Sequence, residues 1–216
     1  MIAEGKESIQ ALCLYRLLCY NIGCERKAGV QMETKAKKLV IMFPGVGYTM
    51  DCPLLYYASF LYEAKGYEQI HMKYNSILFE PDLTKEEKTL KAREYIWEKV
   101  KDIDFSVYDE VVFFSKSFGT AEAGYLAERL GINPVQIYLT PMPRALPYIK
   151  EGDTVVIGTA DEVYPECKAY FDGHGIRPMY VEGADHSLEV KGKPFESLEI
   201  VRDVMAYLDK ENGRDK

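Results

Sequence analysis

The sequence predicts an α/β protein, built as a three-layer sandwich around a mostly parallel, doubly wound sheet of six strands. From residue 38 onward, short runs rich in Val, Ile, Phe and Tyr alternate with segments of helical periodicity. Most of these runs lack a period of two, and near-continuous apolarity indicates strands that are buried on both faces. Repeated strand–helix alternation with short loops then implies right-handed crossovers within one domain.

Six segments are predicted as strands. They are residues 38–43, 69–74, 110–115, 135–139, 154–158 and 178–183. Between them, Thr84 and Glu87 match a capping box, which begins a helical segment that ends near Asp104. Its apolar stripe consists of Ala92, Ile96, Val100 and Ile103. The last helix shows the same spacing at Leu198, Val201, Met205 and Leu208.

Composition limits the classes of function. The 216 residues carry a formal net charge of −7, which disfavours nucleic acid as a partner because a phosphate-binding surface needs clustered Lys and Arg. The segment 11–24 looks like a signal-peptide core, but Arg16 interrupts it and no small-residue cleavage site follows. We expect residues 1–32 to be an N-terminal extension, either a short helix or a peripheral segment. Residues 33–216 are expected to form a single domain of a cytoplasmic protein that does not bind membranes.

The five cysteines show no pattern typical of a metal site or a disulfide framework. They are Cys13, Cys19, Cys24, Cys52 and Cys167. An odd, scattered set without a CxxC pair favours reduced structural thiols. We therefore expect neither a metal nor another cofactor.

Ligands of a doubly wound sheet bind beyond the carboxyl ends of its strands, so the residues that follow each strand are the candidates for chemistry. Ser117 follows the third predicted strand, either as an exposed nucleophile on a tight turn or as a polar residue where a buried strand ends. Asp161 follows the fifth strand, and Asp185 and His186 follow the sixth. A serine becomes a good nucleophile when a histidine takes its proton and a carboxylate orients that histidine.

The chain has three histidines, and one of them lies at this edge. His71 falls inside a predicted strand and His174 in a predicted turn, which leaves His186 as the candidate base. Asp161 is favoured as the orienting acid. Two alternatives stay open: Glu162, which is expected to start the next helix, and Asp185, which adjoins the histidine and so faces it poorly.

An acyl-transfer site also needs backbone donors for the oxyanion. One follows from the position of Phe118, whose amide comes directly after the serine at a helix N-terminus. A second would come from the loop after the first strand, "FPGVGYTMD", where Gly45 and Gly47 let the backbone turn towards the site. This GxG is not a dinucleotide fingerprint, because it lacks the third glycine.

The order of these features resembles the α/β-hydrolase superfamily over residues 37–210: a glycine loop, an SxSxG turn, then an acid and a histidine, each after its own strand. It is most similar to small, lidless members of the dienelactone-hydrolase type. Ser115 stands where the family usually has glycine, and Pro44 where it often has histidine. A small side chain at position 115 is expected to let the turn close against the neighbouring strand.

The resemblance implies a role for each residue. Ser117 would be the nucleophile, His186 the general base and acid, and Asp161 the orienting carboxylate. The amides of Val46 and Phe118 would form the oxyanion hole.

The resemblance also implies a substrate pocket without a lid, because only 14 positions separate residues 139 and 153 (153 − 139 = 14). The pocket is then expected to be open and shallow, which disfavours long-chain lipids. Lys116 is expected to add positive potential at its mouth. The candidates for contact with the substrate are Gly45, Gly47, Tyr48, Lys116 and Met142.

The sequence thus predicts a serine hydrolase that cleaves a small carboxylic ester or thioester through an acyl-enzyme, acting as a monomer or homodimer. Two alternatives stay open. One is a catalytically inactive protein of the same fold that serves as a binding or scaffold module. The other is an acyltransferase or peptidase with the same three residues.

Overall fold

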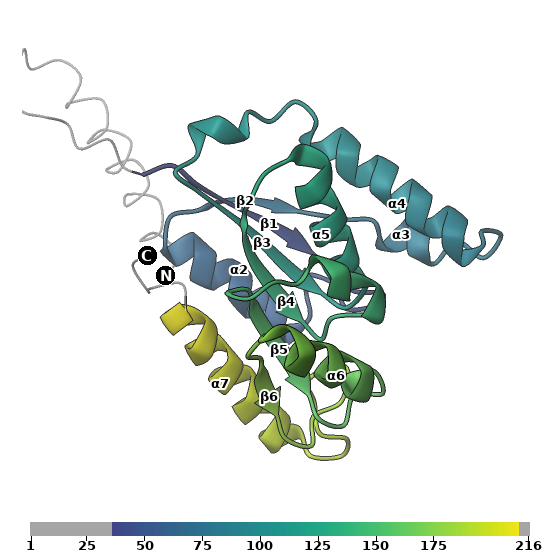
Figure 1. Cartoon of the computed structure of the whole chain (residues 1–216), viewed down its shortest axis with the longest axis vertical. Coiled ribbons are helices and arrows are strands. Elements are labelled where there is room, and N and C mark those ends of the chain that lie inside the picture. The colour runs from purple at the N-terminus through teal and green to yellow at the C-terminus, as the bar shows by residue number, and fades with distance from the viewer. Residues whose placement is uncertain (1–35, 212–216) are drawn as a thin grey trace, which may run out of the picture. The chain divides into compact units, whose positions relative to one another are not determined.

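A computed structural model describes residues 36–211 of the chain (Figure 1). Six strands form one sheet in the order β2-β1-β3-β4-β5-β6, and all neighbouring strands are parallel. The strands are β1 (Lys38–Phe43), β2 (Glu68–His71), β3 (Glu110–Lys116), β4 (Val135–Leu139), β5 (Thr154–Gly158) and β6 (Met179–Val181). The predicted fold class is confirmed.

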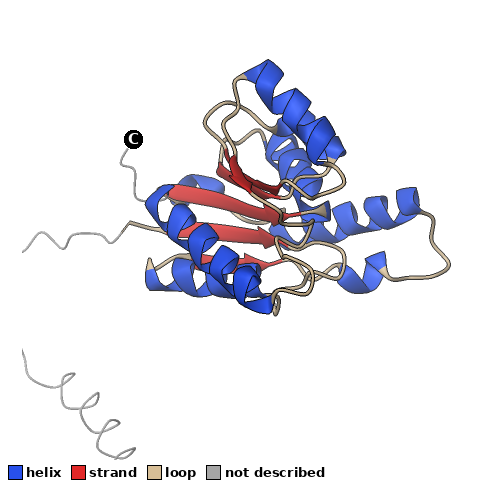
Figure 2. Ribbon diagram, turned by 90° about the horizontal axis from the view of Figure 1, so that it is seen from below, coloured by secondary structure: helices blue, strands red, loops and turns tan. Residues whose placement is uncertain are grey.

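Helices cover both faces of this sheet, as Figure 2 shows. The α-helices are α2 (Pro53–Ala64), α3 (Asn75–Leu78), α4 (Lys85–Val100), α5 (Phe118–Leu130), α6 (Tyr164–His174) and α7 (Pro194–Glu211). Two short 3₁₀ helices, η1 (Phe105–Val107) and η2 (Pro143–Tyr148), lie in the connections. Helices α2 and α7 cover one face, and α3 to α6 cover the other.

The two-sided cover explains why the strands lack a period of two. Successive residues of a strand point to opposite faces. In β1, Val40 and Met42 pack in the core shared with α2 and α7, whereas Leu39 and Ile41 pack in the core shared with α4 and α5. Both faces therefore need apolar residues, and the run is continuously apolar.

The predicted strand bounds differ from the observed ones mainly at the two edges of the sheet. The segment predicted at 69–74 forms a strand at Glu68–His71, and the one predicted at 178–183 pairs only over Met179–Val181. An edge strand has one neighbour, so fewer of its residues are held in the extended ladder.

The predicted capping box is present in α4. The Thr84 hydroxyl accepts a hydrogen bond from the Glu87 amide (3.2 Å), and the Glu87 carboxylate accepts one from the Thr84 amide (2.8 Å). The helix ends at Val100, earlier than predicted, and Ile103 packs on the same core from the following turn.

The stripe predicted for the last helix is wrong at one end. Leu198 is 60% exposed, and Val204 is buried together with Leu208. The physical reason is that α7 packs on the core shared with α2 from Ile200 onward, so the start of the helix, including Leu198, lies outside that core.

Several sequence features fall outside the described residues. They are the extension at 1–32, the predicted boundary at 33, and Cys13, Cys19 and Cys24. Within residues 36–211, Cys52 and Cys167 are free thiols, and no group of three or more His, Cys, Asp or Glu could hold a metal ion. No helix in this part of the chain has the length and apolarity needed to cross a bilayer.

Candidate active site

Ser117 lies on a sharp turn between β3 and α5. The strand ends at Lys116 and the helix begins at Phe118, so Ser117 makes the whole turn, with φ 52° and ψ −117°. A positive φ at a residue other than glycine costs about 1–3 kcal/mol, and such strain clusters at functional sites. The turn presents the hydroxyl at the carboxyl edge of the sheet.

Two small residues allow this turn to close. A Cβ atom at Gly119 would lie 2.2 Å from the carbonyl oxygen of Phe43, so the helix start packs directly on β1. Ser115 is buried, and its hydroxyl donates a hydrogen bond to the carbonyl of Ile137 on β4 (2.8 Å). The serine that stands at the family's usual glycine position thus fits between the strands.

Three side chains from three loops meet at this edge. His186 Nε2 lies 2.7 Å from the Ser117 hydroxyl oxygen, and His186 Nδ1 lies 2.7 Å from Asp161 Oδ2. With the imidazole neutral, Nδ1–H donates to the carboxylate and Nε2 accepts from the hydroxyl. The Asp161 side chain is 1% exposed, whereas that of His186 is 38% exposed. The arrangement couples a buried carboxylate to a serine within reach of solvent.

The surroundings keep Asp161 ionised. Burial alone would raise the pKa of its carboxyl. The hydrogen bond from His186 and that from the Val163 amide (3.1 Å) outweigh burial, with help from the charges of His186 and Lys116, so the pKa is held below its ordinary value. An ionised carboxylate is the form that orients the imidazole.

The two alternative acids point elsewhere. Glu162 is exposed and lies two residues before α6. Asp185 Oδ1 accepts hydrogen bonds from the amides of Ser187 (2.8 Å) and Glu189 (3.2 Å), which shapes the loop that carries His186. Of the three candidates, Asp161 is the one that reaches the imidazole.

The other two histidines lie away from this site. His71 lies in β2, as predicted, with Nε2 2.9 Å from Gln69 Oε1. The turn predicted around His174 is instead the end of α6: the residue stacks on Tyr170, with ring centroids 3.9 Å apart, and Gly175 (φ 69°) follows as the cap. The left-handed cap at Gly175 lets the helix continue through Asp172 and Gly173 to His174, residues that the sequence pattern places in a turn.

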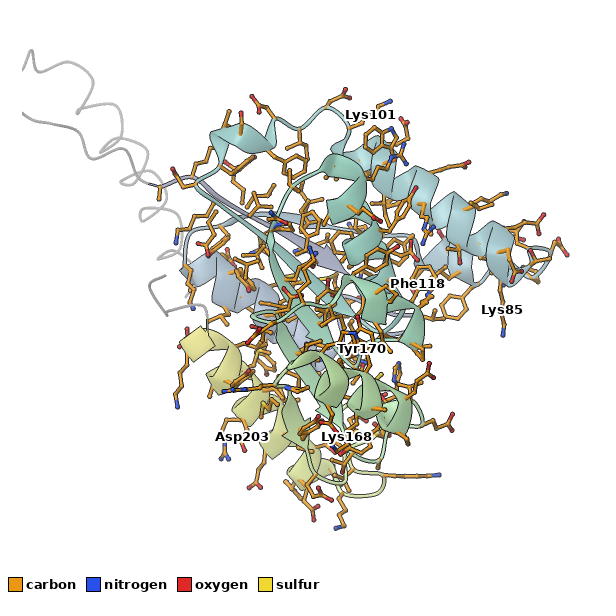
Figure 3. All side chains as sticks on the ribbon, in the orientation of Figure 1. Lys85, Lys101, Phe118, Lys168, Tyr170 and Asp203 are labelled. Carbon is orange, nitrogen blue, oxygen red and sulfur yellow. The ribbon has the colours of Figure 1, made fainter. Side chains whose placement is uncertain are left out.

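The loop after β1 lies directly over the serine. A Cβ at Gly45 would lie 3.0 Å from that of Ser117. The Gly47 amide donates to the Asn75 side-chain oxygen (3.0 Å), which holds the loop against α3. Within residues 36–211, the amides of Val46 and Phe118 donate to no protein acceptor, so both are free for a ligand (Figure 3 labels Phe118 at the start of α5).

A cleft of about 450 Å³ adjoins the histidine. Its lining includes Met142, Asp161 and His186. Tyr48 is half-buried, and its hydroxyl accepts a hydrogen bond from the Leu54 amide (3.2 Å). The connection between β4 and β5 contains only the short helix η2, so within residues 36–211 this connection inserts no helical lid.

Lys116 does not lie at the pocket mouth. It is 1% exposed, and its ammonium donates hydrogen bonds to the Thr140 hydroxyl and the His186 carbonyl. The reason is that the Thr140 hydroxyl, after β4, and the His186 carbonyl, after β6, provide buried acceptors for the ammonium. The expected contact with substrate is therefore corrected to an internal one.

Sequence reasoning missed two threonines that support the site. The Thr120 hydroxyl donates to the Ser117 carbonyl (2.5 Å) and accepts from the Met142 amide (3.2 Å), so it joins the serine turn to the cleft wall. Thr140 has a positive φ of 44° directly after β4. Thr140 follows a strand at the same carboxyl edge as Ser117 and His186, and this position is the sequence signal that could have identified it.

The parallel sheet, its strand order and the serine turn after β3 define the class: the chain has the α/β-hydrolase fold. A Xanthomonas campestris protein described as an α/β-superfamily hydrolase matches with a TM-score of 0.59 and 13% identity, over 79% of this chain and 99% of that one. Dienelactone hydrolase from Anabaena variabilis matches with a TM-score of 0.55 and 16% identity, over 82% and 86%.

A third similar structure is Est1E from Butyrivibrio proteoclasticus with bound ferulic acid. It matches with a TM-score of 0.52 and 12% identity, over 82% of this chain and 91% of that one. Comparison with protein-family models gives no match, and comparison with curated protein sequences gives none either.

Proposed function

We propose that the protein is a serine hydrolase that cleaves a small carboxylic ester or thioester through an acyl-enzyme. The observation that carries the proposal is the pair of 2.7 Å contacts that connect Ser117, His186 and Asp161. Hydrolases among the structures of similar fold support the same class of reaction.

The first half of the reaction forms the acyl-enzyme. The Ser117 oxygen attacks the carbonyl carbon while His186 Nε2 takes the hydroxyl proton, and Asp161 stabilises the imidazolium. The amides of Val46 and Phe118 donate to the oxyanion, and one such donor is worth on the order of 10²- to 10³-fold in rate. The imidazolium then gives its proton to the departing alcohol or thiol.

The second half regenerates the enzyme. Water attacks the acyl group on Ser117, and His186 Nε2 accepts the proton of that water. Collapse of the second tetrahedral intermediate breaks the bond to Ser117 and releases the carboxylic acid, with the proton returned to the serine oxygen. The exposed face of His186 gives water a route to the acyl group.

The open cleft favours small substrates. Among residues 36–211, the connection between β4 and β5 holds only η2, which is too short to enclose a long acyl chain. A long chain would therefore gain little apolar contact beyond its first carbons, at roughly 0.8 kcal/mol for each CH₂ that is buried. A short acyl group has no further carbons to bury, so the open cleft does not weaken its binding.

Hydrolysis of p-nitrophenyl esters of increasing chain length, from acetate to palmitate, tests the proposal. A hydroxycinnamate ester belongs in the panel, because Est1E holds ferulic acid. We expect turnover of short esters with an initial burst of p-nitrophenol, and a decline beyond short chains. Ser117→Ala should lower kcat/KM by on the order of 10⁴-fold or more.

Ser106→Ala is the matched control, since Ser106 lies in η1 and its hydroxyl hydrogen-bonds only to Asp104 within residues 36–211. Its activity should stay within about twofold of wild type. Full activity in Ser117→Ala, or a preference for palmitate, would contradict the proposal. A folded protein that turns over no ester or thioester would instead favour the non-catalytic binding module.

A further inference from the structure

Lys116 is a buried lysine directly before the proposed nucleophile. Its ammonium donates to the Thr140 hydroxyl and to the His186 carbonyl oxygen, the latter at 2.6 Å. The same ammonium lies 4.9 Å from the centre of the Tyr48 ring. An ammonium has three N–H donors, so two hydrogen bonds and one aromatic face account for all of its directions.

These contacts join three separate loops to the end of β3. Tyr48 belongs to the loop after β1, two residues from the Val46 amide. Thr140 follows β4, and His186 follows β6. One side chain thus connects the strand that carries Ser117 to the loop of the oxyanion donor and to the loop of the catalytic base.

Holding a charged lysine at this place has a cost. Burial lowers the pKa of Lys116 to about 8, although several acidic groups nearby act in the opposite direction. Those groups are Asp161, Asp185, Cys52 and Glu189. A methionine of similar length would fill the same volume without a buried charge, and such replacements are often neutral or stabilising. Packing alone does not explain the lysine.

We propose that Lys116 is a positioning residue for the hydrolytic reaction: it fixes the backbone of His186 so that Nε2 stays in line with the Ser117 hydroxyl. This inference rests on the proposed function of the same three residues. The contact with the His186 carbonyl matters more than the charge itself. A positive charge beside the histidine opposes the imidazolium that forms during attack, so the benefit must come from geometry.

The test compares Lys116→Met with wild type. Loss of the hydrogen bond to His186 should let the imidazole shift, and a displacement of about 1 Å can cost on the order of 10²-fold in rate. We expect kcat to fall roughly 10- to 100-fold while KM changes by less than about twofold. The amount of Ser117 that a fluorophosphonate finally labels should equal that of wild type, with slower labelling.

The control variant is Lys168→Met, because Lys168 lies on α6, labelled in Figure 3, and within residues 36–211 its one ion pair is with Asp172. It removes the same charge and should leave both kinetic constants within about twofold of wild type. A fall in activity equal to that of Lys116→Met would overturn the positioning role, since net charge would then be the cause.

Thr140 supplies a second pair of variants in case Lys116→Met does not fold. Thr140→Ala removes one partner of the ammonium and should lower kcat several-fold, whereas Thr140→Ser keeps the hydroxyl and should restore most of that loss. In a folded Lys116→Met background, Thr140→Ala should add little, because the two residues act through one contact.

Three results would overturn the inference. Lys116→Met could keep kcat/KM within twofold of wild type, or raise KM at constant kcat, which would mean contact with substrate. It could also lower kcat only in proportion to lost labelling sites and a lower melting temperature, which is a merely structural effect. Wild type is labelled first in the series: if wild-type Ser117 does not react, the proposed hydrolase fails, and the role of Lys116 in it fails as well.

Discussion

The loops at the carboxyl ends of the strands and the loops at the amino ends differ in backbone strain. Three non-glycine residues of the described chain have positive φ angles, and all three lie in loops at the carboxyl edge: Ser117 after β3, Thr140 after β4 and Leu188 after β6. The loops at the amino edge have no such residue within residues 36–211. Each strained residue costs about 1–3 kcal/mol, so the cost is concentrated where the proposed chemistry lies.

The cleft at the amino ends of the strands and the cleft beside His186 also differ in how well their buried polar groups are hydrogen-bonded. The cleft at the amino ends of β4 and β5 has a volume of about 510 Å³, larger than the 450 Å³ beside His186. Its lining includes Gln136, whose buried side-chain oxygen has no hydrogen-bond partner within residues 36–211. At the carboxyl edge, the buried polar side chains of Lys116 and Asp161 are hydrogen-bonded. Strain combined with a satisfied polar network therefore indicates the site better than volume does.

The largest expected effect is the difference in kcat/KM between variants of His186 and variants of His71, which lies in the edge strand β2. His186→Gln removes the proposed base and should lower kcat/KM for p-nitrophenyl acetate by on the order of 10⁴-fold or more. His71→Gln should stay within about twofold of wild type, because within residues 36–211 the His71 side chain hydrogen-bonds only to Gln69, away from Ser117 and Asp161. Comparable losses in both variants would remove the distinction between the site and its surroundings.

A somewhat smaller effect should distinguish the two adjacent acids. Asp161→Asn keeps the shape but loses the charge that orients the imidazole, so kcat should fall on the order of 10³- to 10⁴-fold at pH 7. Glu162→Gln, one residue further along, should change kcat by less than about twofold. Steady-state kinetics on both variants measures this, and the opposite ranking would assign the acid to Glu162.

Replacing a glycine by alanine should change the free energy of unfolding in opposite directions at the serine turn and in α6. At Gly119 an added Cβ meets the Phe43 carbonyl at 2.2 Å, so Gly119→Ala should destabilise the fold by about 3 kcal/mol. An added Cβ at Gly173 in α6 would meet no other side chain or loop of residues 36–211 within 4 Å, so Gly173→Ala should stabilise the fold by roughly 0.5–1 kcal/mol through helix propensity. Urea unfolding of both variants measures these differences, and equal changes in the two would contradict the close packing of the turn on β1.

The smallest effect concerns pH and Lys116. Its pKa falls from 10.5 in the unfolded chain to about 8 in the fold, so native Lys116 loses its proton first as pH rises. Between pH 8 and 10 the unfolded state then binds more protons at this residue, and stability relative to Lys116→Met should rise with pH. Activity should move the other way, falling several-fold in wild type as the ammonium becomes an amine with fewer donors.

Urea unfolding and kcat, both measured from pH 7 to pH 10 in wild type and Lys116→Met, check this pair of trends. The charged and titratable groups that face Lys116 are Asp161, Asp185, Glu189, Cys52, Tyr48 and His186. They are present in both proteins, so the difference between the two curves reports on Lys116. Parallel curves for activity would show that its charge state does not matter.

The sequence was sufficient for the fold and for the residues that meet at the site. Continuously apolar strands required a parallel sheet, and such a sheet brings the ends of β3, β5 and β6 to one edge, where Ser117, Asp161 and His186 lie. Their order along the chain therefore already limited their positions in space.

The direction of the Lys116 side chain could not be predicted in the same way. Lysine is normally exposed, and its partners here, the Thr140 hydroxyl and the His186 carbonyl, lie 24 and 70 residues further along the chain. Only the folded loops create that buried position. The exposed Leu198 and the helical His174 have a similar cause, because the packing of α7 and the cap of α6 depend on contacts that periodicity does not encode.

Labelling with a fluorophosphonate, followed by peptide mapping, tests most directly whether Ser117 is the nucleophile. We predict that the wild-type protein gains a single adduct on the peptide that contains Ser117, and that Ser117→Ala gains none. Ser115→Gly, which restores the family's usual residue in the turn, should still be labelled at Ser117. An adduct that persists in Ser117→Ala, or that maps to another residue of the wild type, would contradict the assignment.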